Sequence, residues 1–230
     1  MMDEWRKMAE AAWNDKADLW NSNSVEMWNA GSRKDIIPFF KEFVPEEGHI
    51  GDLGCGDGYG SYLLSQNGYR VTGMDLSPRM IELANQNQSE NERLSFIQGD
   101  LTNPPFKEAQ LDGIMAINSL EWTKDPLSVL KEIHRITKPE SYALFGILGP
   151  TAHPRKNSFG RLRGEKVICN TMMPWEFEQL AQENGWKKIA EHHVYKRGVD
   201  THFARQLSSE LKQALTFMTL FMLQKQNLKG

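Results

Sequence analysis

The chain has few of the features that mark extracellular, metal-bound or membrane-spanning proteins. Its 230 residues include only two cysteines, Cys55 and Cys169, so we expect no disulfide framework and no structural metal. No run of about eighteen apolar residues occurs. The first residues carry acids where a signal peptide would have an apolar core. We therefore expect a soluble, cytoplasmic protein without membrane insertion.

A strong charge of either sign is also missing. Lys and Arg number 27 and Asp and Glu number 30, which gives a formal net charge of −3. General binding to nucleic acid normally uses a clustered basic face, so the composition argues against a nucleic-acid partner. With 40% hydrophobic residues, the length fits one compact domain with additions, and the oligomeric state stays open.

What the chain does have is a glycine-rich turn after a short apolar strand. Residues 50–58 are Ile-Gly-Asp-Leu-Gly-Cys-Gly-Asp-Gly. Glycine reaches positive φ without strain and lets the backbone lie directly against a ligand. The dinucleotide fingerprint needs another glycine or alanine where Tyr59 stands, which argues against an oxidoreductase with a nicotinamide cofactor. The turn therefore predicts a nucleotide-cofactor site of another class.

The pattern Asp-x-Gly-x-Gly-x-Gly at residues 52–58 resembles the first motif of the class I S-adenosylmethionine-dependent methyltransferases. In that family the loop surrounds the methionine part of the cofactor. A second strand pattern, Arg70–Asp75, ends in an acid where doubly wound folds place the carboxylate that accepts hydrogen bonds from ribose hydroxyls. Ser77 precedes a proline and can cap the next helix, which would leave Asp75 free for the ribose.

A third strand pattern, from Leu94 to Leu101, ends in Gly-Asp. The resemblance implies that Asp100 accepts a hydrogen bond from the exocyclic amine of adenine, while Leu101 packs on the ring. The cofactor-binding residues that the resemblance implies are Asp52, Gly54, Gly56, Gly58, Asp75, Leu76, Met80, Asp100, Leu101 and Asn118.

The fourth strand pattern is almost wholly apolar from Leu111 and becomes polar at its carboxyl end, as expected of a strand covered on both faces. Ligands bind at that edge in open α/β sheets, so residues 118–122 should lie beside the sulfonium and the substrate. Residues 103–106, Asn-Pro-Pro-Phe, resemble the amino-methylating motif of nucleic-acid and protein methyltransferases. Because they follow the third strand instead of the fourth, we predict an ordinary turn.

Alternating strand and helix patterns predict an α/β fold. The expectation is a Rossmann-like, doubly wound, seven-stranded and mostly parallel sheet whose last strand is antiparallel, in a hairpin with the sixth. The remaining strands are predicted at His49–Leu53, Tyr142–Leu148, Trp186–Tyr195 and Thr216–Gln224. Helices are predicted at Tyr59–Asn67, Pro78–Asn87, Pro126–Thr137, Pro174–Asn184 and Phe203–Gln213.

The secondary structure of two segments has more than one interpretation. Residues 207–223 could instead continue as one helix. Residues 138–141, Lys-Pro-Glu-Ser, stand where the family often has Lys-Pro-Gly-Gly before the fifth strand. We therefore predict a changed type of turn there.

Residues 1–44 are predicted to form a helical lid on a methyltransferase domain of residues 45–230. Trp13, Trp20 and Trp28 are spaced seven and eight residues apart, which places them near one face of a helix. This spacing has two interpretations: core packing, or a cover over the cofactor mouth in which Trp20, Met27, Trp28 or Arg33 touches cofactor or substrate. Aromatic rings beside a sulfonium would also gain cation–π attraction.

The connection after the fifth strand, residues 151–173, is the predicted substrate loop. Residues 151–170 contain five Lys or Arg against one Glu, a local charge of +4 in a chain of −3. This asymmetry suggests an anionic substrate. The alternative is a set of solvated loop charges.

The sequence predicts methyl transfer from S-adenosylmethionine, by in-line displacement, to a small-molecule acceptor, with S-adenosylhomocysteine as the product. The core is similar to the ubiquinone/menaquinone-biosynthesis-like methyltransferases. If the acceptor is a hydroxyl, a base must take its proton, and the candidates are Glu121, His153 and His193. The alternatives are a non-catalytic S-adenosylmethionine-binding regulatory module and an RNA or protein methyltransferase.

Overall fold

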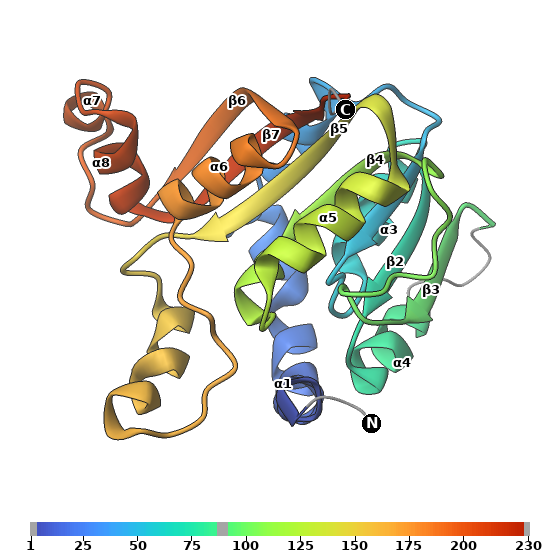
Figure 1. Cartoon of the computed structure of the whole chain (residues 1–230), viewed down its shortest axis with the longest axis horizontal. Coiled ribbons are helices and arrows are strands. Elements are labelled where there is room, and N and C mark those ends of the chain that lie inside the picture. Colours follow the sequence, from blue (N-terminus) through green and yellow to red (C-terminus); the bar gives the residue numbers. More distant parts are fainter. Residues whose placement is uncertain (1–3, 87–91, 228–230) are drawn as a thin grey trace.

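The computed structural model describes residues 4–86 and 92–227, and its centre is a seven-stranded sheet (Figure 1). The strand order is β3-β2-β1-β4-β5-β7-β6. The strands are β1 His49–Leu53, β2 Arg70–Asp75, β3 Leu94–Gln98, β4 Leu111–Ile117, β5 Thr137–Leu148, β6 Trp186–Tyr195 and β7 Thr216–Lys225. The predicted seven-stranded α/β sheet is confirmed.

The order of the strands reverses beside β1. This strand pairs in parallel with β2 on one side and with β4 on the other. The chain therefore moves outward from β1 first towards β3 and then, through β4, towards the other edge. Strand β7 is antiparallel to both β5 and β6, as predicted. A crevice is expected at the carboxyl ends of β1 and β4, because the crossover helices leave in opposite directions there.

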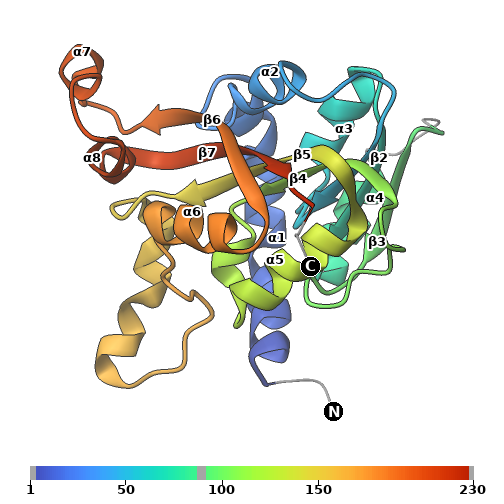
Figure 2. The ribbon, with the colours of Figure 1, turned by 45° about the horizontal axis from the view of Figure 1, so that its top comes forward.

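Helices cover both faces of the sheet (Figure 2). One apolar core joins the sheet to α5 (Pro126–Ile136) and α6 (Pro174–Glu183). The other joins the opposite face to α2 (Ile36–Lys41) and α3 (Tyr59–Gln66). Helix α4 (Pro78–Gln86) follows β2; Asn87, the predicted last residue of this helix, lies outside the described residues.

The N-terminal region forms one long helix, α1 (Glu4–Asn29), followed by α2. Its Ala17 packs with Met80 and Leu83 of α4, while Trp28 belongs to the core around α3. Tryptophans at intervals of seven and eight residues therefore do lie on a single continuous helix. Within the described part of the chain, no helix combines the length and apolarity that crossing a membrane requires.

The alternative of one helix over residues 207–223 is wrong. Two short helices, α7 (Thr201–Ala204) and α8 (Ser209–Ala214), precede β7. The strand then pairs along its length with β5 and with β6. Its run of threonine, phenylalanine and other bulky apolar residues suits a strand whose two faces are both buried.

Strand β5 begins at Thr137, earlier than the predicted Tyr142. The expected separate turn at residues 138–141 is instead part of the strand, with a register shift against β4 between Leu111 and Gly113. Glu140 takes a φ of 64° in this irregular stretch. Glu140 thus takes the left-handed backbone conformation at a position where the family often has a glycine.

Candidate cofactor site

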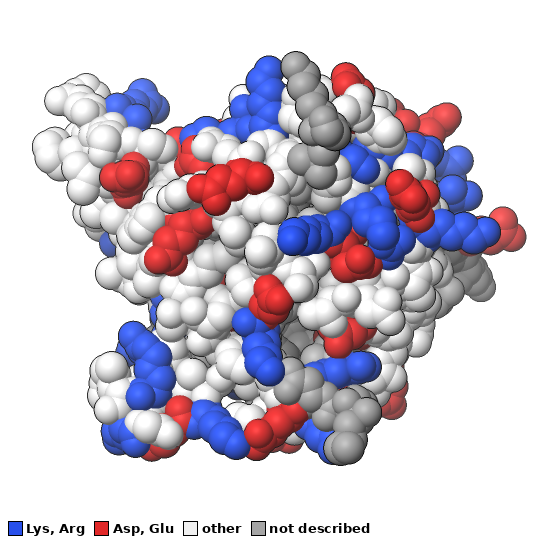
Figure 3. Space-filling model, in the orientation of Figure 1, with Lys and Arg blue, Asp and Glu red and all other residues white. Residues whose placement is uncertain are grey.

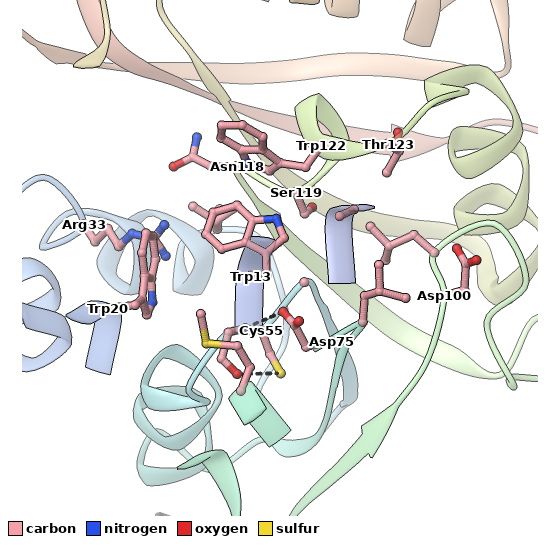
Figure 4. A pocket seen from close by; sticks show the side chains of 17 residues that line it. Trp13, Trp20, Arg33, Cys55, Asp75, Asp100, Asn118, Ser119, Trp122 and Thr123 are labelled. Carbon is pink, nitrogen blue, oxygen red and sulfur yellow. Dashed lines mark hydrogen bonds between the residues drawn. The ribbon is translucent and has the colours of Figure 1, made fainter. Parts of the chain in front are cut away.

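A pocket opens at the carboxyl ends of the central strands, beneath α1 (Figure 4). Together with the solvent at its mouth it holds about 730 Å³ of space that no atom fills. The lining residues come from α1, the glycine turn and the ends of β2, β3 and β4. They are Ala9, Trp13, Trp20, Arg33, Gly54, Cys55, Gly56, Asp75, Leu76, Met80, Asp100, Leu101, Ile117, Asn118, Ser119, Trp122 and Thr123.

The glycine turn forms the floor of the pocket with bare backbone. The N–H groups of Gly54 and Cys55 both donate to the Met74 carbonyl, at 2.8 and 3.1 Å, which fixes the turn to β2. Gly54 has a φ of 79°, and a Cβ there would lie 2.5 Å from the Cβ of Ser119. Gly56 has a φ of 57°, and a Cβ there would lie 3.2 Å from Nε1 of Trp20. Glycine at both positions therefore lets the turn lie close against Ser119 and Trp20 without strain.

Asp75 lies at the pocket wall and also holds the turn in place. Its Oδ2 accepts the Gly56 N–H at 2.9 Å, and its Oδ1 accepts the Ser77 N–H at 2.9 Å. As expected, Ser77 caps α4 by accepting the Met80 N–H at 3.1 Å, although the Asp75 carboxylate also accepts the two backbone N–H groups of Gly56 and Ser77. Burial raises the pKa of Asp75 against these hydrogen bonds. An ionised carboxylate has about four acceptor sites, so Asp75 keeps acceptor capacity for a ligand hydroxyl.

The adenine-side pair predicted from the third strand also reaches the pocket. Asp100 and Leu101 both line it. Asp100 Oδ1 accepts the Thr102 N–H at 2.9 Å, and Oδ2 lies 3.4 Å from Nε of Arg6 on α1. A carboxylate beside the pocket is thus already in contact with the lid helix.

Arg33 is the one cation among the described residues that line the pocket. Its guanidinium lies over the ring of Trp20 at 4.7 Å (Figure 4). It also lies over the ring of Trp28 at 5.3 Å. Burial lowers the pKa of Arg33 to about 10, against the attraction of Asp57, Asp52 and Glu121. The group therefore stays protonated at neutral pH and presents a positive charge beside the glycine turn.

Two predicted cofactor residues lie behind the pocket wall and are not part of its lining. Asp52 is buried and accepts a hydrogen bond from Ser61 at 2.5 Å, and burial raises the pKa of Asp52 to about 7. Gly58 begins α3 with a φ of 76°, where a Cβ would lie 2.5 Å from the ring of Phe96. These two residues shape the turn from beneath, whereas the other eight predicted cofactor residues line the pocket.

None of the three candidate bases lines the pocket. Glu121 is fully buried behind it and accepts the Leu148 N–H at 2.6 Å, and burial raises its pKa. His153 is exposed at the start of the 3₁₀ segment η2 (His153–Arg163). His193 lies on β6, at the far edge of the sheet, where its ring stacks on Tyr195 at 5.6 Å. Burial lowers the pKa of His193.

The cations of residues 151–170 lie outside the pocket. Arg155 is buried and donates to the carbonyls of Leu148, Gly149 and Met172, so it ties η2 to the end of β5. The other four are exposed: Lys156, Arg161 and Arg163 on η2, and Lys166 in the loop after it, where it pairs with Glu4 of α1. Figure 3 shows several basic side chains in its lower left, where this segment lies. The five cations are therefore four exposed loop charges and one buried arginine, Arg155, that holds the loop in place.

Tryptophans of the lid divide between two roles. Trp13 and Trp20 line the pocket. Trp28 is buried against α3, where a Cβ on Gly60 would lie 2.3 Å from its ring. Trp122, which follows β4, completes the pocket wall. The sequence analysis placed Trp122 at the site, as the end of the range 118–122, but did not assign Trp13, whose signal was the tryptophan spacing.

A doubly wound sheet with a glycine turn at its switch point, and acids after the next two strands, defines a nucleotide-cofactor-binding protein. A family model described as a methyltransferase domain matches residues 51–145. YqeM of Bacillus subtilis (strain 168), named as a methyltransferase, is 34% identical over 108 residues, which is 45% of this chain and 44% of the relative. Over residues 51–145 the chain thus matches a methyltransferase domain, and the S-adenosylmethionine-dependent methyltransferases that it resembles imply S-adenosylmethionine as the cofactor.

Two further comparisons agree. Malonyl-[acyl-carrier protein] O-methyltransferase of Serratia marcescens is 34% identical over 124 residues, which is 54% of this chain and 47% of the relative. The chain thus spans about half the length of these two relatives. A solved chain from the complex between the Haloferax volcanii Trm112 methyltransferase activator and a methyltransferase has a TM-score of 0.69 at 21% identity, covering 94% of this chain and 98% of that one. That likeness concerns the fold.

Proposed function

We propose that this protein transfers a methyl group from S-adenosylmethionine to a small-molecule acceptor and releases S-adenosylhomocysteine. The observation that carries the proposal is the set of complementary groups around the glycine turn. Asp75 suits the ribose hydroxyls, Asp100 the amine of adenine, and Arg33 the carboxylate of the methionine part. Gly54 and Gly56, which line the pocket, present bare backbone to the ligand.

When bound, the cofactor supplies a methyl carbon that its sulfonium already activates for displacement. Methyl transfer would form a bond from the acceptor atom to this carbon and break the carbon–sulfur bond, whose electron pair would remain on sulfur. The protein has to orient the two partners and exclude water, which can supply a large part of the rate enhancement. The rings of Trp13, Trp20 and Trp122 provide that cover. Since no candidate base lines the pocket, we assign the acceptor proton to solvent.

Two observations bear on the class of acceptor. An anionic acceptor follows from the local charge of residues 151–170, and a carboxyl acceptor from the name of the Serratia marcescens relative. The position of the cations argues against both an anionic and a carboxyl acceptor. Arg33 lies on the glycine-turn side of the pocket, and the cations of residues 151–170 lie outside its described lining, so neither would pair with an acceptor anion. A small molecule suits the enclosed pocket better than a nucleic acid, since positive and negative side chains are mixed over the face in Figure 3.

Calorimetric titration with S-adenosylmethionine, S-adenosylhomocysteine and NADH tests the cofactor assignment. We expect the two adenosyl ligands to bind and NADH not to bind. Asp75→Ala should weaken adenosyl binding by about 1–3 kcal/mol, whereas Asp15→Ala, on the exposed side of α1, should not. Equal binding by both variants would remove Asp75 from the site. Binding without turnover of any acceptor would favour the regulatory module.

A further inference from the structure

Three tryptophans contact one another edge to face along one wall of the pocket (Figure 4). The rings of Trp13 and Trp20 are 5.9 Å apart at 90°, and those of Trp13 and Trp122 are 5.2 Å apart at 83°. Trp20 is engaged by the Arg33 guanidinium on the side of the glycine turn. Trp13 and Trp122 instead continue the wall away from Arg33, beyond the end of β4.

The region beyond these two rings is apolar. Trp122 belongs to a cluster with Ala9 of α1, the end of β5 and the loop on either side of η2. The buried members of the cluster are Ala9, Trp122, Leu148, Ala152, Ile168 and Cys169, and Trp5, Met8, Ala12, Trp13, Leu76 and Phe217 pack against them. None of these side chains is ionised at neutral pH; burial raises the pKa of the Cys169 thiol.

The lining residues that flank Trp122 in sequence, Asn118, Ser119 and Thr123, are uncharged. Glu121 and Arg155 lie behind the lining and bind backbone groups, although Glu121 Oε2 and Arg155 Nη1 have no hydrogen-bond partner among the described residues. Lys16 Nζ lies 5.4 Å from the Trp13 ring and is also outside the lining. Moving an ionised acceptor beside an uncharged lining removes its water without pairing it directly with a charge, which is unfavourable. A flat uncharged molecule avoids that penalty and gains contact with the rings of Trp13 and Trp122, which stand at 83° to each other.

We propose that the acceptor is a planar, uncharged aromatic molecule that Trp13 and Trp122 recognise. This inference rests on the proposed function and specifies the acceptor class of the same pocket. Trp13 comes from the lid and Trp122 from the end of β4, so the two rings meet only when α1 covers the pocket. Acceptor recognition and lid closure are therefore one event, and both rings are specificity residues.

The test uses matched two-ring probes on the full chain saturated with S-adenosylhomocysteine. The probes are 2-naphthol (neutral and planar), 2-naphthoate (an anion), 2-naphthylmethylammonium (a cation) and decahydro-2-naphthol (neutral but not planar). Calorimetry and tryptophan fluorescence report binding. We expect 2-naphthol to bind at least about tenfold more tightly than each of the others, a difference of about 1.4 kcal/mol.

Variants separate recognition from general stability. Trp122→Leu and Trp13→Leu should each weaken 2-naphthol binding at least about tenfold, while Trp13→Phe should recover most of it. Trp175→Leu, on α6 and outside the pocket lining, is the matched control and should bind as the parent does. Thermal melts and S-adenosylhomocysteine titration show which variants remain folded.

Each other outcome decides against the inference. Tighter binding of 2-naphthoate would assign an anionic acceptor, and tighter binding of the ammonium probe a cationic one. No binding of 2-naphthol, or binding that both leucine variants leave unchanged, also overturns it. Failure of S-adenosylhomocysteine to bind would instead contradict the proposed function, so the two results are distinguishable.

Discussion

The two walls of the pocket are built in different ways. The sheet-side wall consists of bare backbone and carboxylates, held by main-chain hydrogen bonds such as those from Gly54 and Cys55 to Met74. The lid-side wall consists of large side chains on α1, such as Trp13 and Trp20, which meet the sheet only through contacts distant in sequence. The sheet side therefore has its shape without the lid, whereas the lid side depends on docking.

Apolar contacts of α1, such as those of Ala17 and Trp28, are buried, whereas its ion pairs are partly exposed and individually weak. Exposed ion pairs contribute roughly 0.2–1 kcal/mol each. Among the described residues, three ion pairs join α1 to the rest of the protein: Glu4–Lys166, Arg6–Asp100 and Asp18–Arg79. Polar contacts add Trp5 Nε1 to the Trp122 carbonyl at 3.1 Å and Ser77 Oγ to Asn14 Oδ1 at 2.6 Å. A rigid cofactor wall under a releasable cover suits an enzyme that must admit two ligands.

The largest effect is expected from a substitution in the sheet-side wall. Gly56→Val places a branched side chain at a φ of 57°, with its Cβ 3.2 Å from Nε1 of Trp20. We expect adenosyl binding to fall by about 100-fold or more, because both the backbone shape and the ligand space are lost. Gly198→Val is the matched control: its φ is 89°, but open space surrounds it. Equal losses in calorimetry would show that strain, and not the site, is responsible.

Arg33→Met tests the point where the two walls meet. The variant keeps an apolar chain against Trp20 and Trp28 but removes the charge. We expect S-adenosylhomocysteine binding to weaken by about 1.5–3 kcal/mol, the range for a hydrogen bond to a charged group. Binding of 5′-methylthioadenosine, which lacks the carboxylate, should change little. If both ligands weaken equally, Arg33 supports the lid and does not contact the carboxylate.

The pH dependence of folding stability tests the role of Asp52, which supports the sheet-side wall from beneath. Its pKa in the folded protein is about 7, above the ordinary value of 3.8, so between these values the folded state binds more protons than the unfolded state. Stability should therefore fall as pH rises through this window, and Asp52 contributes at most about 1.4 kcal/mol per pH unit.

Asp52→Asn should flatten that dependence while keeping an oxygen that accepts from Ser61. Urea unfolding between pH 5 and 8, on the parent and the variant, measures the slope. Parallel curves would contradict the assignment of this proton to Asp52. Asp57, Asp75 and Glu121 also have raised pKa values, so some pH dependence should remain in the variant.

The smallest effect is expected from the lid contacts. Glu4→Ala removes the ion pair with Lys166, so cofactor dissociation should quicken by a few-fold at most, in line with about 1 kcal/mol or less. Glu26→Ala, exposed near the end of α1, is the control. Stopped-flow displacement of S-adenosylhomocysteine measures the rate. A slower rate in Glu4→Ala would show that this pair does not hold the lid closed.

Local sequence was sufficient for much of the sheet. Strand and helix patterns located β1, β2, β6 and β7 within a residue or so, because alternating apolar and polar positions depend on burial of each segment. The role of Asp75 was only half predicted, since its hydrogen bond with Gly56 spans nineteen positions and requires β1 and β2 to be paired. The earlier start of β5 likewise depends on pairing with β4 and β7.

The sequence by itself determined the cofactor class, because the glycine turn and the acids that end the second and third strands form short motifs that can be recognised from adjacent residues. Only the tertiary structure decided which residues meet. It moved Glu121 and Arg155 into structural roles, left the loop cations outside the pocket, and brought Trp13 to Trp122. The physical reason is that a turn is set by its own backbone angles, whereas a contact between α1 and the end of β4 depends on how the whole chain packs.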